Sequence, residues 1–188
     1  MKKVKKLQKW STTSSKYVLK DKWIKVRADS CRTKSGEVIS PYYVLEYPDW
    51  VRMVVVNRKN EILVTRQYRH GTKQIVAELV SGTVDPNDKS HLSAAKRELL
   101  EEVGYTGKFT LLGIFSPNPA NQTNYSYTYL VTNPKQVTIP VINPFEVVQY
   151  EFKSVTDILK LIDKKEFVQE MHISSLFLAL RKTRILHI

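Results

Sequence analysis

Residues 92–105 read LSAAKRELLEEVGY, and this stretch decides how the rest of the chain is interpreted. On an α-helix, positions three and four apart share a face, so the carboxylates of Glu98, Glu101 and Glu102 converge there. A separate apolar stripe can pack against a sheet, and it consists of Leu92, Ala95, Leu99 and Val103. We therefore predict a helix over residues 91–103 that ends at Gly104 and directs its acidic cluster away from the core.

The acidic cluster on this helix predicts a metal site. Neighbouring carboxylates repel one another unless a cation lies between them. Oxygen ligands of this kind suit the hard divalent ions Mg²⁺ and Mn²⁺. With phosphate oxygens completing its shell, such an ion can orient a pyrophosphate, offset its charge and activate a water molecule. The alternative is a solvated acidic face, which is the ordinary explanation of an isolated Glu-x-x-Glu-Glu.

The segments around this helix predict a mixed α/β domain. A hairpin is expected over 53–65, followed by a strand over 75–80. After the helix, the pattern predicts three strands and two further helices, over residues 110–115, 125–131, 146–152, 154–164 and 172–184. Earlier in the chain, alternating apolar and polar residues over 23–29 and 42–47 predict a small antiparallel β-unit.

Gly82, followed by the segment RELLEEVGY at 97–105, resembles the Nudix box of the Nudix hydrolases. Two departures from the usual box concern the loop before the helix. The spacing from this glycine to the arginine is one residue longer, and the spaced Glu of the box is missing. Asp88 or Lys89 stands in its place, depending on the direction of counting. A one-residue insertion around 86–90 explains both departures and leaves the three helix carboxylates untouched.

The Nudix resemblance implies a role for each motif residue. Glu98 and Glu102 are expected to bind metal, and Glu101 to contribute to the metal site or to hold the catalytic water. Ser81, which precedes the glycine of the box, would give its backbone carbonyl to the metal. The implied cofactor is Mg²⁺, with Mn²⁺ as a substitute. The residues with structural roles in the motif are Gly82, Arg97 and Gly104.

Further segments are similar to the ADP-ribose pyrophosphatase and nucleoside-diphosphate-sugar hydrolase branch of this family, at 23–27, 48–50, 64–69 and 78–79. The resemblance weakens after residue 135. It implies a Nudix α/β/α sandwich with a mixed β-sheet, preceded by the small N-terminal antiparallel β-unit. It also implies a homodimer formed through that β-unit, with the base stacked between aromatic residues of both subunits.

Aromatic and basic residues in these segments are candidates for substrate binding. Trp23 and either Tyr42 or Tyr43 are candidates for the base clamp, because stacking on aromatic rings adds to burial. Arg69 is the candidate phosphate contact, through its planar fork of donors. The alternatives are ordinary strand packing for the aromatic residues and an exposed strand-end arginine.

Polar residues elsewhere complete the expected site. Glu78 is a candidate either for binding the substrate or for holding a structural partner in the protein. Asn121 lies in an amide-rich segment, which either binds sugar hydroxyls or base edges or forms a solvated turn. The resemblance implies a general base in a loop before the last sheet strand. Glu146 is the candidate there and Glu151 the second choice, although a water held by the helix carboxylates needs no loop base.

The net charge of +12 is concentrated at one end of the chain. Residues 1–27 carry ten Lys and Arg against one Asp, and the remainder is close to neutral. We predict a basic flexible arm at 1–16, the β-unit with its dimerisation role at 17–48, and the Nudix domain at 49–188. A basic chain suggests a nucleic-acid partner. Because the charge lies outside the catalytic motif, we do not expect one.

Cysteine content and hydropathy bear on the compartment. Cys31 is the single cysteine, which excludes an intrachain disulfide and suits a reducing environment. No apolar stretch approaches the ~20 residues of a membrane helix, and no apolar segment follows the basic start. We expect a cytoplasmic protein without a membrane partner.

These features predict Mg²⁺-dependent hydrolysis of the pyrophosphate bond of nucleoside diphosphate sugars, with ADP-ribose and GDP-mannose as the leading substrates. The products would be a nucleoside monophosphate and a sugar phosphate. One alternative is an RNA 5′-pyrophosphohydrolase, which the basic arm favours and the aromatic β-unit does not. The other is a non-catalytic Nudix-fold nucleotide sensor. Such modules commonly lose the helix carboxylates, which this chain keeps.

Overall fold

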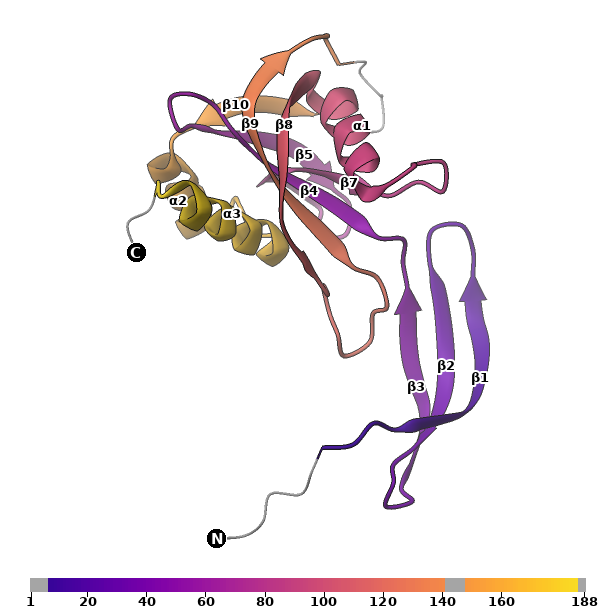
Figure 1. The fold of residues 1–188 in the computed structure, drawn as a ribbon. Helices are drawn as coiled ribbons and strands as arrows, with labels where there is room; N and C mark the ends of the chain where they lie inside the picture. Colours follow the sequence, from indigo (N-terminus) through magenta and orange to yellow (C-terminus); the bar gives the residue numbers. More distant parts are fainter. Residues whose placement is uncertain (1–6, 141–147, 186–188) are drawn as a thin grey trace, which may run out of the picture. The chain divides into compact units, whose positions relative to one another are not determined.

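The computed structural model describes residues 7–140 and 148–185, which divide into two compact units (Figure 1). One unit comprises the chain up to residue 47 together with residues 116–124. The other comprises residues 48–115 and those from 125 onward. Within the described ranges, no helix combines the length and the apolar character that a membrane-spanning segment requires.

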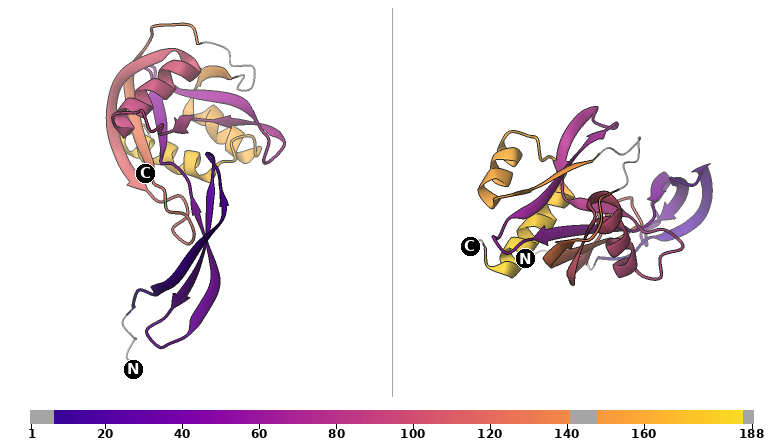
Figure 2. Two further views of the ribbon diagram at one scale, coloured as in Figure 1. Left: turned by 90° about the vertical axis from the view of Figure 1, so that its right-hand side faces the viewer. Right: turned by 90° about the horizontal axis from the view of Figure 1, so that it is seen from above.

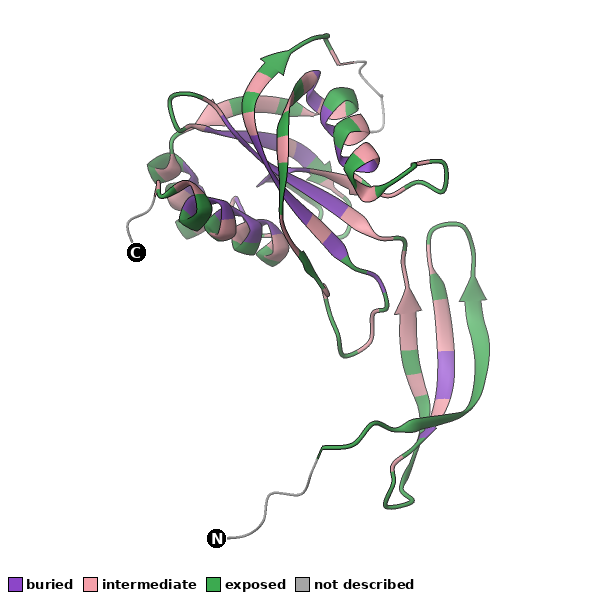
Figure 3. Ribbon diagram, viewed as in Figure 1, coloured by how far each residue is buried: buried purple, intermediate pink, exposed green. Residues whose placement is uncertain are grey.

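The first unit is a three-stranded antiparallel sheet in the order β1-β2-β3. Its strands are β1 (Ser11–Lys20), β2 (Lys25–Arg32) and β3 (Val38–Glu46). Residues 116–124 lie beside β3, where the Leu45 N–H donates to the Asn121 carbonyl at 2.7 Å and the Thr123 N–H donates to the Leu45 carbonyl at 3.2 Å. Every residue of β1 is exposed, and little of the sheet is buried (Figure 3).

The structure differs from the flexible arm expected at 1–16, because residues 11–16 form the first part of β1. They pair with β2 from Ser11, opposite Arg32, to Lys16, opposite Ala28. The hydroxyl of Thr13 also donates to a β2 carbonyl at 3.0 Å. A run of Ser and Thr has the composition of a linker. Its backbone pairs with β2 here, and the short polar side chains suit an exposed edge strand.

The second unit contains a seven-stranded mixed sheet. Its main path runs β10-β5-β4-β9-β8, while β6 pairs with β5 and β7 pairs with β4. Strands β4 and β9 are parallel, and the other pairs are antiparallel. The strands are β4 (Trp50–Val56), β5 (Ile62–Arg69), β6 (Gln74–Glu78), β7 (Val80–Thr83), β8 (Tyr105–Phe115), β9 (Ser126–Gln136) and β10 (Gln149–Lys153).

Three helices cover the two faces of this sheet (Figures 1 and 2). Helix α1 (His91–Val103) packs on one face, and α2 (Val155–Asp163) and α3 (Glu170–Thr183) pack on the other. Side chains of β4 alternate between the two cores: Met53 and Val55 face α1, whereas Val54 and Val56 face α2 and α3. Because both faces of the strand are covered, residues 53–56 are all apolar. The α/β sandwich predicted from the sequence is confirmed.

The helix predicted from the opening motif spans the expected residues. Ser90 caps its N-terminus: the Ser90 Oγ accepts from the Ser93 N–H at 3.1 Å, and the Ser93 Oγ accepts from the Ser90 N–H at 2.8 Å. The strand expected over 75–80 is divided at Leu79 into β6 and β7. The division arises because the chain stops pairing with β5 and begins to pair with β4.

Gly104 ends α1 in the left-handed conformation, with φ 74°. A Cβ added there would lie 2.1 Å from the Thr138 carbonyl oxygen. We expect Gly104→Ala to lower the free energy of unfolding by about 1–3 kcal/mol, because the alanine would be strained and would clash. Urea denaturation followed by circular dichroism measures the change. Gly71→Ala is the control, since nothing lies within 4 Å of its added Cβ. Equal losses in both variants would contradict the role given to Gly104.

Candidate active site

Glu98 packs directly against the backbone of β7. A Cβ added at Gly82 would lie 2.0 Å from the carboxyl carbon of Glu98, so a larger residue here would displace this carboxylate from its position. The helix lies this close because its apolar residues, including Ala95 and Leu99, are buried against the sheet. The packing of α1 therefore sets the position of its acidic face, and it explains why the motif places a glycine opposite this glutamate.

Glu102, one turn further along α1, is the most perturbed acid of the site. The Ser81 N–H donates to its carboxylate, whereas Oε2 is buried and accepts no hydrogen bond within the described ranges. Burial, followed by the negative charge of Glu98, raises the pKa of Glu102 to about 8, against the opposing effect of Arg69. A buried carboxylate oxygen without a donor is unfavourable, and a bound cation would satisfy it.

The groups around Glu102 fit a hard divalent cation. The N–H and C=O of one strand residue point to the same side, so the Ser81 carbonyl lies on the side of its bond to Glu102. In the part of the chain that the structure describes, no three acidic, histidine or cysteine side chains converge as a ready-made cage. Mg²⁺ needs none, because it typically takes one or two carboxylates and completes its shell with water and phosphate oxygens.

Arg97 ties the acidic helix face to the loop before it. Its Nη1 donates to Glu98 and to Glu101, both at 2.9 Å. Its Nε and Nη2 donate to Asp88 at 3.2 and 2.9 Å, which lowers the pKa of that carboxyl. Asp88 therefore supplies the loop carboxylate that the irregular motif spacing left open. Glu101 is 58% exposed and is held by the guanidinium on the surface of the helix.

Arg69, at the end of β5, is held by Glu78 at the end of β6. The Arg69 Nε lies 3.1 and 3.0 Å from the two carboxylate oxygens of Glu78, and its Nη2 lies 2.6 Å from Oε2. Glu78 is only 3% exposed, and Gln67 donates to it at 3.3 Å. Of the two alternatives for Glu78, this geometry favours the structural partner. The effect of Arg69 on the pKa of Glu102 puts its charge within range of the acidic site.

The structure thus brings most of the predicted residues together in the second unit. Those that interact with one another there are Ser81, Gly82, Glu98, Glu101, Glu102, Arg97, Arg69 and Glu78.

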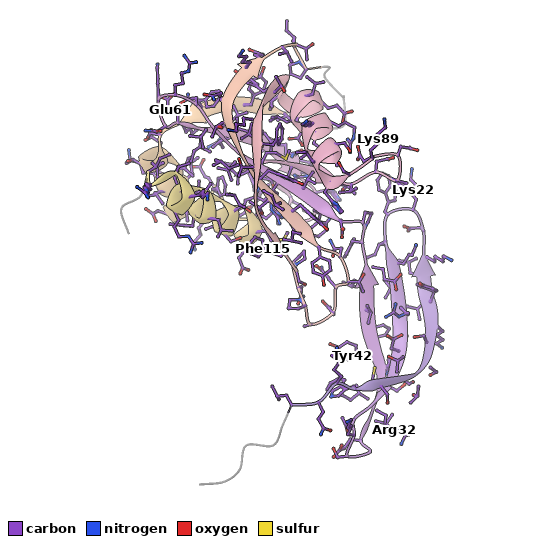
Figure 4. All side chains as sticks on the ribbon, in the orientation of Figure 1. Lys22, Arg32, Tyr42, Glu61, Lys89 and Phe115 are labelled. Carbon is purple, nitrogen blue, oxygen red and sulfur yellow. The ribbon has the colours of Figure 1, made fainter. Side chains whose placement is uncertain are left out.

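The candidates for base and sugar recognition belong to the first unit. Trp23 is 71% exposed, and the Nζ of Lys22 lies 4.4 Å from its ring centroid. Lys22, which Figure 4 labels, lies in the turn between β1 and β2. Tyr43 is also exposed, on β3. The Oδ1 of Asn121 is buried and has no hydrogen-bond partner among the described residues.

The expected general base, Glu146, lies outside the described residues. Glu151, the second choice, is exposed on β10 and pairs with Lys153 at 2.7 Å. His172, expected to be a surface or packing residue, is 1% exposed, and its Nδ1 accepts from the Leu79 N–H at 3.1 Å. No ligand spacing in the sequence could have singled out this histidine, because the contact depends on how α3 packs.

Comparison with known proteins agrees with the fold. Residues 46–172, well over half of the chain, match the family model of the NUDIX domain. The chain belongs to the Nudix hydrolase family. In this Nudix hydrolase, residues 10–45 match a second model, described as the nucleoside diphosphate sugar hydrolase N-terminal domain.

A solved structure described as "Crystal structure of ADP compounds hydrolase" is similar to this Nudix hydrolase, with a TM-score of 0.83 and 21% sequence identity. The match covers 96% of this chain and 97% of that chain, so the two share a fold over almost their whole lengths. A search of the curated proteins finds no significant match.

Mg²⁺ is expected to stabilise the folded protein through Glu102. At ten times its dissociation constant, a ligand of the folded state adds about 1.4 kcal/mol, or about 3–6 °C in melting temperature for a chain of this length. Differential scanning fluorimetry with and without Mg²⁺ measures this shift. Glu102→Gln should abolish it, whereas the exposed control Glu170→Gln should retain it. A full shift in the Glu102 variant would remove this residue from the metal site.

The stability of the Nudix hydrolase should also depend on His172. Burial, followed by the positive charges of Arg52 and Arg69, holds the pKa of His172 well below its ordinary 6.5. The unfolded chain then binds a proton that the folded chain does not. The free energy of unfolding should therefore fall as the pH drops below about 6.5, by up to about 1.4 kcal/mol per pH unit. Urea unfolding across this range should show a smaller slope for His172→Asn, and an unchanged slope for the exposed control His70→Asn.

Proposed function

We propose that this Nudix hydrolase cleaves the pyrophosphate bond of nucleoside diphosphate sugars with the help of Mg²⁺. The observation that carries the proposal is the unsatisfied buried Oε2 of Glu102, together with Arg69, whose charge acts on that carboxyl. The carboxylate suits a cation and the guanidinium suits a phosphate. The sugar hydrolase model matched by residues 10–45, and the similarity to a structure described as an ADP compounds hydrolase, support a nucleoside diphosphate compound as the substrate.

Glu98, Glu102 and the Ser81 carbonyl would hold the metal, which is Mg²⁺ or its substitute Mn²⁺. When bound, such an ion neutralises pyrophosphate charge and makes a coordinated water more acidic. Glu101 would hold the water network at the exposed edge of the site. Arg97 keeps two of these carboxylates in place through its bonds to both, and its bonds to Asp88 fix the guanidinium itself.

Arg69 would bind a phosphate of the substrate, and Glu78 would orient it. The bonds to Glu78 engage Nε and Nη2. Nη1 would then be available to a ligand, on a side chain that is 43% exposed. In the reaction, the oxygen of a water molecule bonds to one phosphorus while the bond from that phosphorus to the bridging oxygen breaks. The water proton passes to a base, for which Glu146 is our candidate. The products are a nucleoside monophosphate and a sugar phosphate.

The base and the sugar would be recognised by residues of the first unit in a homodimer. Among its described residues, only two apolar side chains, Ala28 and Cys31, are buried. Exposed aromatic rings such as Trp23 and Tyr43 are therefore available for stacking. Asn121 would accept a hydrogen bond from a ligand hydroxyl or amine at its unpaired Oδ1. ADP-ribose and GDP-mannose are the substrates we favour.

A substrate panel with Mg²⁺ tests this function. The panel comprises ADP-ribose, GDP-mannose, UDP-glucose, NADH, diadenosine polyphosphates and RNA with a 5′-triphosphate. We expect cleavage of a nucleoside diphosphate sugar, and Glu102→Gln should lower kcat by about 10³-fold or more while leaving the circular dichroism spectrum unchanged. Cleavage of RNA alone would favour the pyrophosphohydrolase alternative. Tight binding of a nucleotide without cleavage of any substrate would favour a sensor.

A further inference from the structure

The strand that carries Glu78 and Ser81 changes partner in the middle of the site. Strand β6 pairs with β5 as far as Glu78, which lies opposite Thr65. Strand β7 then pairs with β4 from Val80, which lies opposite Met53. Leu79 stands between the two ladders and is only 1% exposed. A buried backbone N–H requires an acceptor, and for this residue neither ladder supplies it.

His172 on α3 supplies that acceptor. Its Nδ1 lies 3.1 Å from the Leu79 nitrogen, and the side chain is 1% exposed. An imidazole nitrogen that accepts a hydrogen bond carries a lone pair, so the proton of this neutral ring is on Nε2. The ring packs edge-on against buried Phe167, with centroids 6.4 Å apart at 63°, which fixes its orientation. Burial and the charges of Arg52 and Arg69 favour the neutral form that can accept.

The residues on either side of Leu79 belong to different parts of the site. Glu78 binds Arg69 with its carboxylate, and its carbonyl accepts from the Thr65 hydroxyl at 3.3 Å. Two residues after Leu79, the Ser81 N–H binds Glu102. Residues 78–81 thus join the residue that holds Arg69 to the residue that binds Glu102. The N–H of Leu79, within this segment, is bound by His172 of α3, which packs on the face of the sheet opposite to α1.

We propose that His172 is a positioning residue of the active site: it fixes the backbone at Leu79 and thereby sets the distance between Arg69 and the metal ligands. The proposal rests on the function proposed above, in which Arg69 binds phosphate and Glu102 binds metal. His172 would touch neither substrate nor metal. It would act on both through the backbone between β6 and β7, to which it is hydrogen-bonded at Leu79.

Two substitutions separate the acceptor from the bulk of the ring. Asn carries Oδ1 on Cγ, as His carries Nδ1, so His172→Asn can keep the bond to Leu79. His172→Leu fills similar space but leaves the buried N–H without a partner. His172→Gln is a second variant without the contact, because its carbonyl lies one methylene further out, and it replaces the Leu variant if that one does not fold. Ser174→Ala, an exposed change on the same helix, is the control.

The test combines amide hydrogen exchange at Leu79, measured by NMR, with kcat and KM for the best substrate of the panel. In His172→Leu we expect Leu79 to exchange about tenfold faster or more, and kcat/KM to fall by about tenfold or more. In His172→Asn both values should stay within about threefold of wild type. The apparent Mg²⁺ affinity, from the fluorimetric shift, should weaken in the Leu and Gln variants, which lose the contact, and not in His172→Asn or Ser174→Ala.

Wild-type exchange at Leu79 together with wild-type kinetics in His172→Leu would overturn the proposal. Equal losses in the Leu and Asn variants would also overturn it, because the ring would then act through its size. If the wild type cleaves no member of the panel, the proposed function fails. Exchange at Leu79 and the Mg²⁺ shift would still decide between a positioning and a packing histidine.

Discussion

The contact between the Glu98 carboxylate and the backbone at Gly82 is the constraint on which the site depends. A side chain at residue 82 would occupy the space that the Glu98 carboxylate fills. One turn further along α1, the Oε2 of Glu102 is buried, and the Ser81 N–H donates to the carboxylate. The burial of the apolar stripe of α1 offsets the cost of placing an acid there. The packing of α1 on the sheet therefore determines how deeply the Glu102 carboxyl is buried, and with it the raised pKa of that group.

The other charges of the site are organised in pairs. Arg97 is matched by Asp88 and by two helix glutamates, and Arg69 is matched by Glu78. Each arginine is thereby fixed in direction by an acid from a different segment of the chain. Among the described residues at this site, the Oε2 of Glu102 stands out as the buried oxygen that these pairs leave unsatisfied. This oxygen is therefore the atom of the site that a bound cation would satisfy.

How much the sequence could predict depended on how local each feature is. The helix over His91–Val103 follows from its own period and from its capping residues, so its limits and its acidic face were predictable. The Arg69–Glu78 pair requires the register of β5 on β6, which no spacing reveals. The break at Leu79 falls within residues 75–80, which the sequence pattern predicts as one strand. The Ser and Thr residues of β1 suit a linker as well as an edge strand. The roles of Trp23, Tyr43, Asn121 and Glu146 stay predictions, as do the metal-binding roles of the helix carboxylates and the phosphate contact of Arg69.

The first unit is discontinuous in the sequence, because residues 116–124 leave the second unit between β8 and β9 and return to it. Ala120, Asn121 and Thr123 of this segment hydrogen-bond to β3, and the family model of the N-terminal domain covers only the continuous part, 10–45. The chain therefore passes between the units three times. The N-terminal sheet is consequently not a detachable module. Cutting the chain near residue 47 would remove β3 and leave Asn121 and Thr123 without the Leu45 backbone to which they hydrogen-bond.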